Sequence, residues 1–218
     1  MLGHWRAGQK TWLFDLDNTL HNASPHIFPH INHSMMAYIR EHLGVDETEA
    51  TRLRQDYWQR YGATLLGLMR HHGTDPHHFL WHTHQFPDLA RMVVFERGLK
   101  AMLRRLPGRK IVFSNAPLHY TDAVLQLTRI ADCFDTVYTI ERLRFQPKPA
   151  IAGFRHLLRS ERLLPQRCIM VEDSLPNLKT AKRLGMKTVW VSSDTRQPPY
   201  VDVRLASLLD LPDQFRRL

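Results

Sequence analysis

The chain has 218 residues, of which 43% are hydrophobic and 23% are charged. These fractions are typical of a folded protein and argue against disorder, and the length allows one large domain with an insertion. No apolar run reaches the roughly 18 residues of a membrane span, and Met1 to Lys10 lack the apolar segment of a secretory signal. We therefore expect a cytoplasmic protein without a membrane partner, with both cysteines, Cys133 and Cys168, reduced and buried.

The net charge of +9 has two interpretations. Such a field attracts a polyanion such as nucleic acid, but it also favours a small phosphorylated substrate. The lysines and arginines form no dense run, which is typical of a scattered, solvated basic surface. Net charge alone does not decide between these partners. We expect no nucleic-acid partner, and the sequence contains no indication of the oligomeric state.

The first predicted strand is followed by a long helical insertion. Residues 11–14 (TWLF) form an apolar run that ends at charged residues, as a buried strand does. The stretch before the next such run is far longer than a simple crossover needs, and apolar spacings of three and four predict helices over 31–43 and 47–69. We predict that residues 21–94 form a helical cap over the carboxyl edge of a sheet, whereas residues 1–20 and 95–218 form the domain that contains the sheet.

The remainder of the chain alternates apolar runs with amphipathic segments. Strands are predicted at 110–113, 168–171 and 188–191, and helices at 98–106, 118–130, 150–158 and 175–184. An edge strand near 200–203 and a helical turn at 205–209 complete the pattern. Apolar strands that alternate with helices indicate an α/β fold with a Rossmann-like parallel sheet that is covered on both faces.

Reactive side chains follow the first strand. Ligands of an open parallel sheet bind beyond the carboxyl ends of its strands. Asp15 and Asp17 stand two residues apart, so an extended segment presents both carboxylates on one face. One can attack an electrophile while the other transfers a proton or turns toward a metal ion. Taken alone, the pair also fits an acidic turn.

Two further motifs are suited to holding an anion. Ser114 and Asn115 follow the second strand, where a hydroxyl and a backbone amide can bind phosphate oxygens. Lys148 stands between Pro147 and Pro149, which restrict the local backbone and hold the ammonium group in place. Each motif alone also fits an ordinary turn or surface loop.

Adjacent carboxylates follow the third of these strands. Glu172 and Asp173 would lie near Asp15 and repel it unless a cation neutralised them. Oxygen ligands select a hard ion, and Mg²⁺ commonly bridges carboxylate and phosphate. Asn177, one helical turn later, is placed to support this group.

Together, the four motifs resemble those of the haloacid dehalogenase superfamily of phosphohydrolases. In chain order they are DLDNT at 15–19, Ser114 with Asn115, Lys148, and Glu172 with Asp173. The helical insertion matches the position of the cap in that superfamily. The resemblance covers nearly the whole chain and implies a phosphomonoester hydrolase whose substrate is a small phosphorylated molecule.

The resemblance also implies a role for each core residue. Asp15 would be the nucleophile and would form an aspartyl-phosphate. Asp17 would protonate the leaving group and then deprotonate the hydrolytic water. Ser114, the amide of Asn115 and Lys148 would hold the transferred phosphoryl group.

A Mg²⁺ cofactor is part of the same implied mechanism. Its ligands would be Asp15, the backbone carbonyl of Asp17 and Asp173. Glu172 would bind the ion either directly or through water, and the sequence does not distinguish the two.

A narrower likeness points to the pyrimidine 5′-nucleotidase branch. It rests on FDLDNTLHNAS, FSNA, QPKP, VEDSLPN and the cap segment 57–68. It implies a pyrimidine nucleoside monophosphate as substrate, with His21, Asn22, Tyr61 and Thr64 as candidate contacts. The aromatic residue Trp58 of the same segment is interpreted as core rather than as a base-stacking group.

Two alternatives stay open. The four motifs fit equally a phosphatase or phosphomutase that acts on a sugar phosphate or another small monoester. From a different class, the chain would be a non-catalytic nucleic-acid-binding or regulatory protein on the same scaffold, although its complete set of motifs argues against this.

Overall fold

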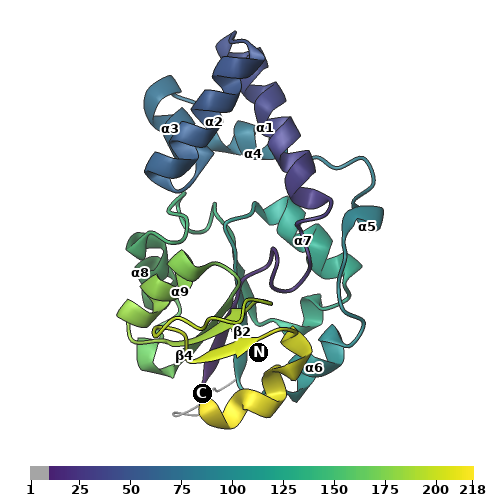
Figure 1. The fold of residues 1–218 in the computed structure, drawn as a ribbon, viewed down its shortest axis with the longest axis vertical. Coiled ribbons are helices and arrows are strands. Elements are labelled where there is room, and N and C mark those ends of the chain that lie inside the picture. The colour runs from purple at the N-terminus through teal and green to yellow at the C-terminus, as the bar shows by residue number, and fades with distance from the viewer. Residues whose placement is uncertain (1–9) are drawn as a thin grey trace.

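The structure, a computed structural model, describes residues 10–218 and contains a six-stranded parallel sheet in the order β3-β2-β1-β4-β5-β6 (Figure 1). The strands are β1 (Thr11–Phe14), β2 (Arg109–Phe113), β3 (Thr136–Tyr138), β4 (Cys168–Glu172), β5 (Lys187–Val191) and β6 (Val203–Leu205). Every neighbouring pair is parallel, which confirms the predicted α/β class. The first nine residues lie outside the described residues. They belong to the predicted sheet domain and to the segment in which we expected no secretory signal.

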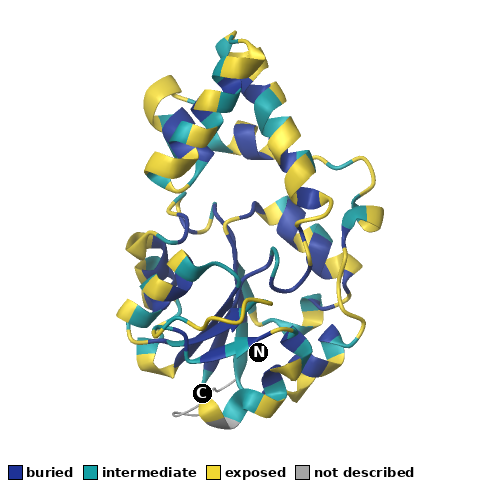
Figure 2. Cartoon of the chain, viewed as in Figure 1, coloured by how far each residue is buried: buried dark blue, intermediate teal, exposed yellow. Residues whose placement is uncertain are grey.

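Alternate side chains of each strand enter two separate apolar clusters, one on each face of the sheet. Trp12 and Phe14 of β1 point into one cluster and Leu13 into the other. The first face is covered by α6 (Leu99–Arg105), α7 (Leu118–Leu127) and the 3-10 segment η3 (Leu208–Arg217), and the second by α8 (Ile151–Ser160) and α9 (Leu175–Arg183). The central strands β1 and β4 are therefore buried along their whole length, and Figure 2 shows dark blue strands in the middle of the sheet.

Four helices lie beyond the carboxyl ends of the strands, at the top of Figure 1. These cap helices are α1 (Ile27–Leu43), α2 (Glu47–Tyr61), α3 (Thr64–His72) and α4 (Pro76–Thr83), and the short α5 (Leu89–Met92) leads back to the sheet. They pack around an apolar cluster of their own, which Ile140 and Phe145 join from the segment after β3. By contrast, Ile27 and Ile31 at the base of α1 pack into a cluster of the sheet.

Three predicted elements need correction. The helix expected over 47–69 is two helices, because Gly62 has a φ of 78° and ends α2 in the left-handed region. The two helices then pack closely against each other, and this contact requires Gly67 on α3, since a Cβ there would lie 2.1 Å from Cγ of Tyr57 on α2. The last strand lies at 203–205 instead of 200–203, and η3 begins at Leu208 instead of at residue 205.

The remaining differences concern β3, the cysteines and short 3-10 turns. β3 was not predicted, and the turns η1 (Ala131–Cys133) and η2 (Pro165–Arg167) were also not expected. Both cysteines are free thiols, but only Cys168 is buried, whereas Cys133 is half-exposed on η1. Within residues 10–218, no helix combines the length and apolar character that crossing a bilayer requires.

Candidate active site

The three central strands bring the predicted motifs together at one edge of the sheet. β1 lies between β2 and β4, and Phe14 pairs with Val112 on one side and with Val171 on the other. The residues that follow these strands therefore leave the sheet at the same level. One carboxylate oxygen each from Asp15, Glu172 and Asp173 lie within 4.8 Å of one another.

Lys148 reaches this acidic group from the loop before α8. Its Nζ donates to Oδ1 of Asp15 at 2.6 Å and to Oε2 of Glu172 at 2.7 Å, and only 2% of the residue is exposed. The side chain of Asn115 fixes the lysine backbone, donating to its carbonyl oxygen at 2.9 Å and accepting from its N–H at 2.8 Å. Asn115 thus connects the second motif to the third, which its spacing in the sequence did not indicate.

Burial dominates the electrostatics of the acidic group. Burial, reinforced by the charge of Glu172, raises the pKa of Asp15 to about 7. Burial likewise raises the pKa of Glu172 to about 7, and it raises that of Asp173. Burial disfavours the charged ammonium form of Lys148, but the adjacent carboxylates of Asp15 and Glu172 have the larger effect, so the pKa of Lys148 is raised. One lysine does not neutralise three carboxylates, so the all-oxygen group fits a hard divalent cation.

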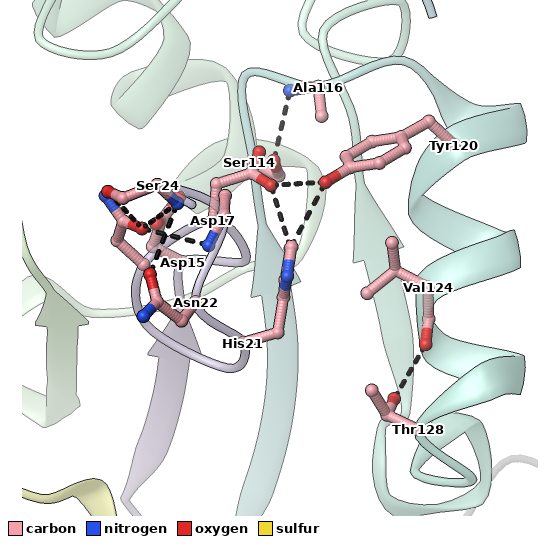
Figure 3. A network of polar contacts seen from close by, with 12 residues as sticks. Asp15, Asp17, His21, Asn22, Ser24, Ser114, Ala116, Tyr120, Val124 and Thr128 are labelled. Carbon is pink, nitrogen blue, oxygen red and sulfur yellow. Dashed lines mark hydrogen bonds and ion pairs between the residues drawn. The ribbon is translucent and has the colours of Figure 1, made fainter. Parts of the chain in front are cut away.

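Asp17 is held by two side chains that the sequence analysis did not assign to it. The Tyr120 hydroxyl donates to Oδ1 of Asp17 at 2.6 Å, and Nε2 of His21 lies 2.9 Å from the same oxygen (Figure 3). Burial, together with the charge of Asp17, raises the pKa of Tyr120 and keeps its hydroxyl protonated. His21 was predicted to contact substrate, but it is only 3% exposed and packs beside Asp17.

The loop after Asp17 is organised by the side chain of Asn18. This residue has a φ of 59°, and its Oδ1 accepts from the backbone N–H groups of Ala23 at 3.0 Å and Ser24 at 3.1 Å. Asn22, another predicted substrate contact, is exposed and accepts from the Ser24 N–H at 3.2 Å. The backbone N–H of Asn22 donates to the Val94 carbonyl at 2.7 Å. This hydrogen bond joins the segment that enters the cap helices to the segment that returns from them.

A cavity of about 1180 Å³ separates the cap helices from the ends of the strands. Its lining includes the core motif residues Asp15, Asp17, Ser114, Asn115, Lys148, Glu172 and Asp173. Of the four predicted substrate contacts, Thr64 lines this cavity, whereas Tyr61 lies outside the lining and bonds to Nε2 of His71 at 2.6 Å. Thr64 itself is buried, and its hydroxyl donates to the Arg54 carbonyl at 3.0 Å.

Sequence analysis underestimated the cavity-facing side of α2. Arg54, Gln55, Trp58 and Gln59 all line the cavity. Trp58, which we expected in the core, is 62% exposed. The spacing of aromatic residues does not show which face of a helix meets another helix and which meets a cavity.

Sequence comparison identifies the family to which this geometry belongs. Residues 9–185 match the family described as haloacid dehalogenase-like hydrolase. Phosphate metabolism protein 8 from Saccharomyces cerevisiae is 26% identical in an alignment of 140 residues that covers 59% of this chain and 43% of the yeast protein. The chain therefore aligns with less than half of that relative.

Solved structures with similar folds include enzymes of different chemistry. A HAD phosphatase from Thermococcus onnurineus aligns with a TM-score of 0.66 and 21% identity over 94% of this chain and 97% of its own. The L-2-haloacid dehalogenase from Xanthobacter autotrophicus with chloropropionic acid covalently bound aligns with a TM-score of 0.61 and 17% identity. This alignment covers 95% of this chain and 98% of the dehalogenase chain. These likenesses concern the fold, whereas the sequence match covers well over half of the chain. The protein is a member of the haloacid dehalogenase-like hydrolase family.

Proposed function

We propose that this hydrolase cleaves phosphomonoesters through an aspartyl-phosphate on Asp15, with residues 21–94 acting as a cap over residues 1–20 and 95–218. The observation that carries this proposal is the contact of 2.6 Å between the buried Asp15 carboxylate and the Lys148 ammonium at the cavity. A nucleophile beside a fixed cation suits attack on an anionic phosphoryl group, because the cation offsets the repulsion between the two anions. The separate apolar cluster of the cap helices supports the domain division.

In this mechanism, Asp15 is the nucleophile and Asp17 is the general acid and base. A carboxylate oxygen of Asp15 attacks phosphorus while the bond to the leaving oxygen breaks, and Asp17 gives its proton to that oxygen. Asp17 then takes a proton from the water that attacks the aspartyl-phosphate, which releases phosphate and restores Asp15. Oγ of Ser114 accepts from the Ala116 N–H at 3.0 Å, so its own proton can be donated to a phosphoryl oxygen.

The carboxylates at the cavity fit a Mg²⁺ ion. Asp15, Asp173 and the backbone carbonyl of Asp17 would hold it, and the bound ion would neutralise the carboxylates and polarise the phosphoryl group. Glu172 has a different role in this proposal, since its two oxygens already accept from Lys148 at 2.7 Å and from the Ser174 N–H at 3.2 Å. These contacts favour Glu172 as the anchor of Lys148 and an indirect partner of the ion.

Removing divalent cations is expected to abolish phosphate release, and Mg²⁺ is expected to restore it. The Asp173→Asn variant should need at least about tenfold more Mg²⁺ for half-maximal activity, because it loses one anionic ligand. The exposed Asp122 on α7 provides a control with the same change of charge, and Asp122→Asn should keep the wild-type Mg²⁺ requirement. Full activity after exhaustive dialysis against EDTA would contradict the metal assignment.

For the substrate, we propose a nucleoside 5′-monophosphate, with pyrimidines preferred. The cavity of about 1180 Å³ is larger than a small sugar phosphate needs, since sites for drug-sized ligands span about 300–1,000 Å³. The exposed ring of Trp58 lines this cavity beside the polar side chains of Arg54, Gln55 and Gln59. A flat base with hydrogen-bonding edges suits such a surface, and the preference for pyrimidines follows the sequence likeness.

The test is a substrate panel that reports both phosphate and isomerised products. We expect kcat/KM for uridine and cytidine 5′-monophosphates to exceed the values for purine nucleotides, glucose 6-phosphate and phosphoglycolate. Trp58→Ala should lower the nucleotide values roughly tenfold, since stacking on a base is worth about 1–3 kcal/mol, and should leave the small phosphates unaffected. Trp81→Ala is a matched control, because Trp81 is 56% exposed on α4 and lies outside the cavity lining.

Each alternative has its own outcome in this panel. A preference for small phosphates would support a phosphatase and contradict the assignment as a nucleotidase. An isomer formed without free phosphate would indicate a mutase. Equal purine and pyrimidine values would remove only the pyrimidine preference. The formation of neither phosphate nor an isomer from any monoester would favour the non-catalytic alternative.

A further inference from the structure

Two buried side chains from different parts of the chain meet at one oxygen of Asp17. Tyr120 comes from α7 and His21 from the loop after β1, and they are 1% and 3% exposed. Their polar atoms lie 2.6 and 2.9 Å from Oδ1 of Asp17 and 3.2 Å from each other. Figure 3 shows both side chains pointing at this carboxylate.

The hydrogen bonds determine which atoms carry protons. The Tyr120 hydroxyl donates to Asp17, so its oxygen is available as an acceptor toward His21. A bare Nε2 on His21 would face the lone pairs of the Asp17 carboxylate, so Nε2 carries a proton. Nδ1 of His21 is buried without a hydrogen-bond partner among the described residues, so Nε2 makes all the polar contacts of this ring that the structure describes.

We propose that Tyr120 and His21 are positioning residues that hold Oδ1 of Asp17, so that Oδ2 is the oxygen that exchanges protons with the substrate and with water. The inference rests on the acid–base role of Asp17 in the proposed function. In the first step the proton moves from Oδ2 to the leaving oxygen as the bond to phosphorus breaks. In the second step Oδ2 takes a proton from the attacking water, while the tyrosine and histidine keep theirs.

Tyr120 and His21 fix the orientation of the Asp17 carboxylate, whereas Lys148 fixes the carboxylates of Asp15 and Glu172. Asp15 and Glu172 both contact Lys148, whereas Asp17 contacts the Tyr120 hydroxyl and the His21 ring. A carboxylate free to rotate would spend less time aimed at the leaving oxygen, and small misplacements of a catalytic group can cost about 10²-fold in rate. The orienting pair would therefore affect kcat more than KM.

The Tyr120→Phe variant tests the hydroxyl alone, because the ring keeps its place in the apolar cluster. We expect kcat to fall roughly 10- to 100-fold with KM nearly unchanged. Tyr138→Phe is the matched control, since Tyr138 is also fully buried and its hydroxyl donates to the Glu161 carboxylate at 2.7 Å, away from Asp17. It should keep kcat within about twofold of wild type, because its hydroxyl contacts no group that reacts.

Substitutions of His21 give an independent measurement. Gln places an amide N–H near the position of Nε2, so His21→Gln should retain most of the activity that His21→Leu loses. If both variants have the same kcat, the donor on His21 is irrelevant and the inference fails for this residue.

A double-mutant cycle separates positioning from a general structural effect. In an Asp17→Asn background, Tyr120→Phe should cause no further loss of kcat, because the carboxylate that it orients is gone. An equal loss in both backgrounds would overturn the inference, as would wild-type kcat in Tyr120→Phe. Wild-type turnover by Asp17→Asn itself would instead contradict the acid–base role in the proposed function.

Discussion

Asp15→Asn is expected to lower kcat for phosphate release by at least about 10³-fold, because in the proposed mechanism the amide replaces the attacking carboxylate. The fold should survive, since the amide oxygen can still accept from Lys148 in the position where Oδ1 accepts at 2.6 Å. Kinetics of purified protein and thermal unfolding provide the two measurements. Rapid acid quenching of wild type during turnover should show phosphate on the peptide that contains Asp15.

The exposed Asp122 again supplies the control, and Asp122→Asn should keep wild-type kcat. Turnover by Asp15→Asn within tenfold of wild type would rule out the covalent mechanism. A phosphorylated peptide that lacks Asp15 would do so as well.

Lys148→Met should lose both activity and stability. Its ammonium is buried between the Asp15 and Glu172 carboxylates, and removing one partner of a buried ion pair typically costs about 3–5 kcal/mol. Its kcat should fall by about 10³-fold, because no cation remains beside the nucleophile. Guanidinium unfolding and phosphate release measure the two effects.

Two further variants separate these effects. Lys148→Met with Glu172→Gln removes a charge of each sign, so it should recover much of the lost stability and none of the activity. Lys182→Met removes a lysine that pairs with Asp202 at 2.6 Å but is 36% exposed, and it should cost about 1 kcal/mol at most. Activity of Lys148→Met within tenfold of wild type would remove this lysine from the mechanism.

The core of the site was predictable because its signals are local. Each central strand is a short apolar run, and Asp15, Ser114 and Glu172 directly follow such runs, so the parallel topology brings these three residues together. β3 was missed because it has only three residues, two of them half-buried, and so lacks a continuous apolar run. The break at Gly62 was missed because apolar residues continue at helical spacing on both sides of it.

The contacts of Asp17 could not have been predicted in the same way. Tyr120 is 103 residues from Asp17 in the chain, and on an amphipathic helix it has the pattern of a core residue. Its ring does pack in the core, and only the hydroxyl reaches the site. A periodic pattern describes which face of a helix is apolar and contains no information about a polar atom at the end of a buried ring.

The apolar cluster of the cap helices has a consequence for recombining domains within this family. Ile140 and Phe145 are not part of the inserted segment, yet they pack into that cluster, and the loop that carries Lys148 begins directly after Phe145. A chimaera that received α1–α4 alone would leave holes where these two side chains belong. Exchange of caps between relatives therefore requires a second, discontinuous graft, which spans Ile140 to Phe145 and ends just before Lys148.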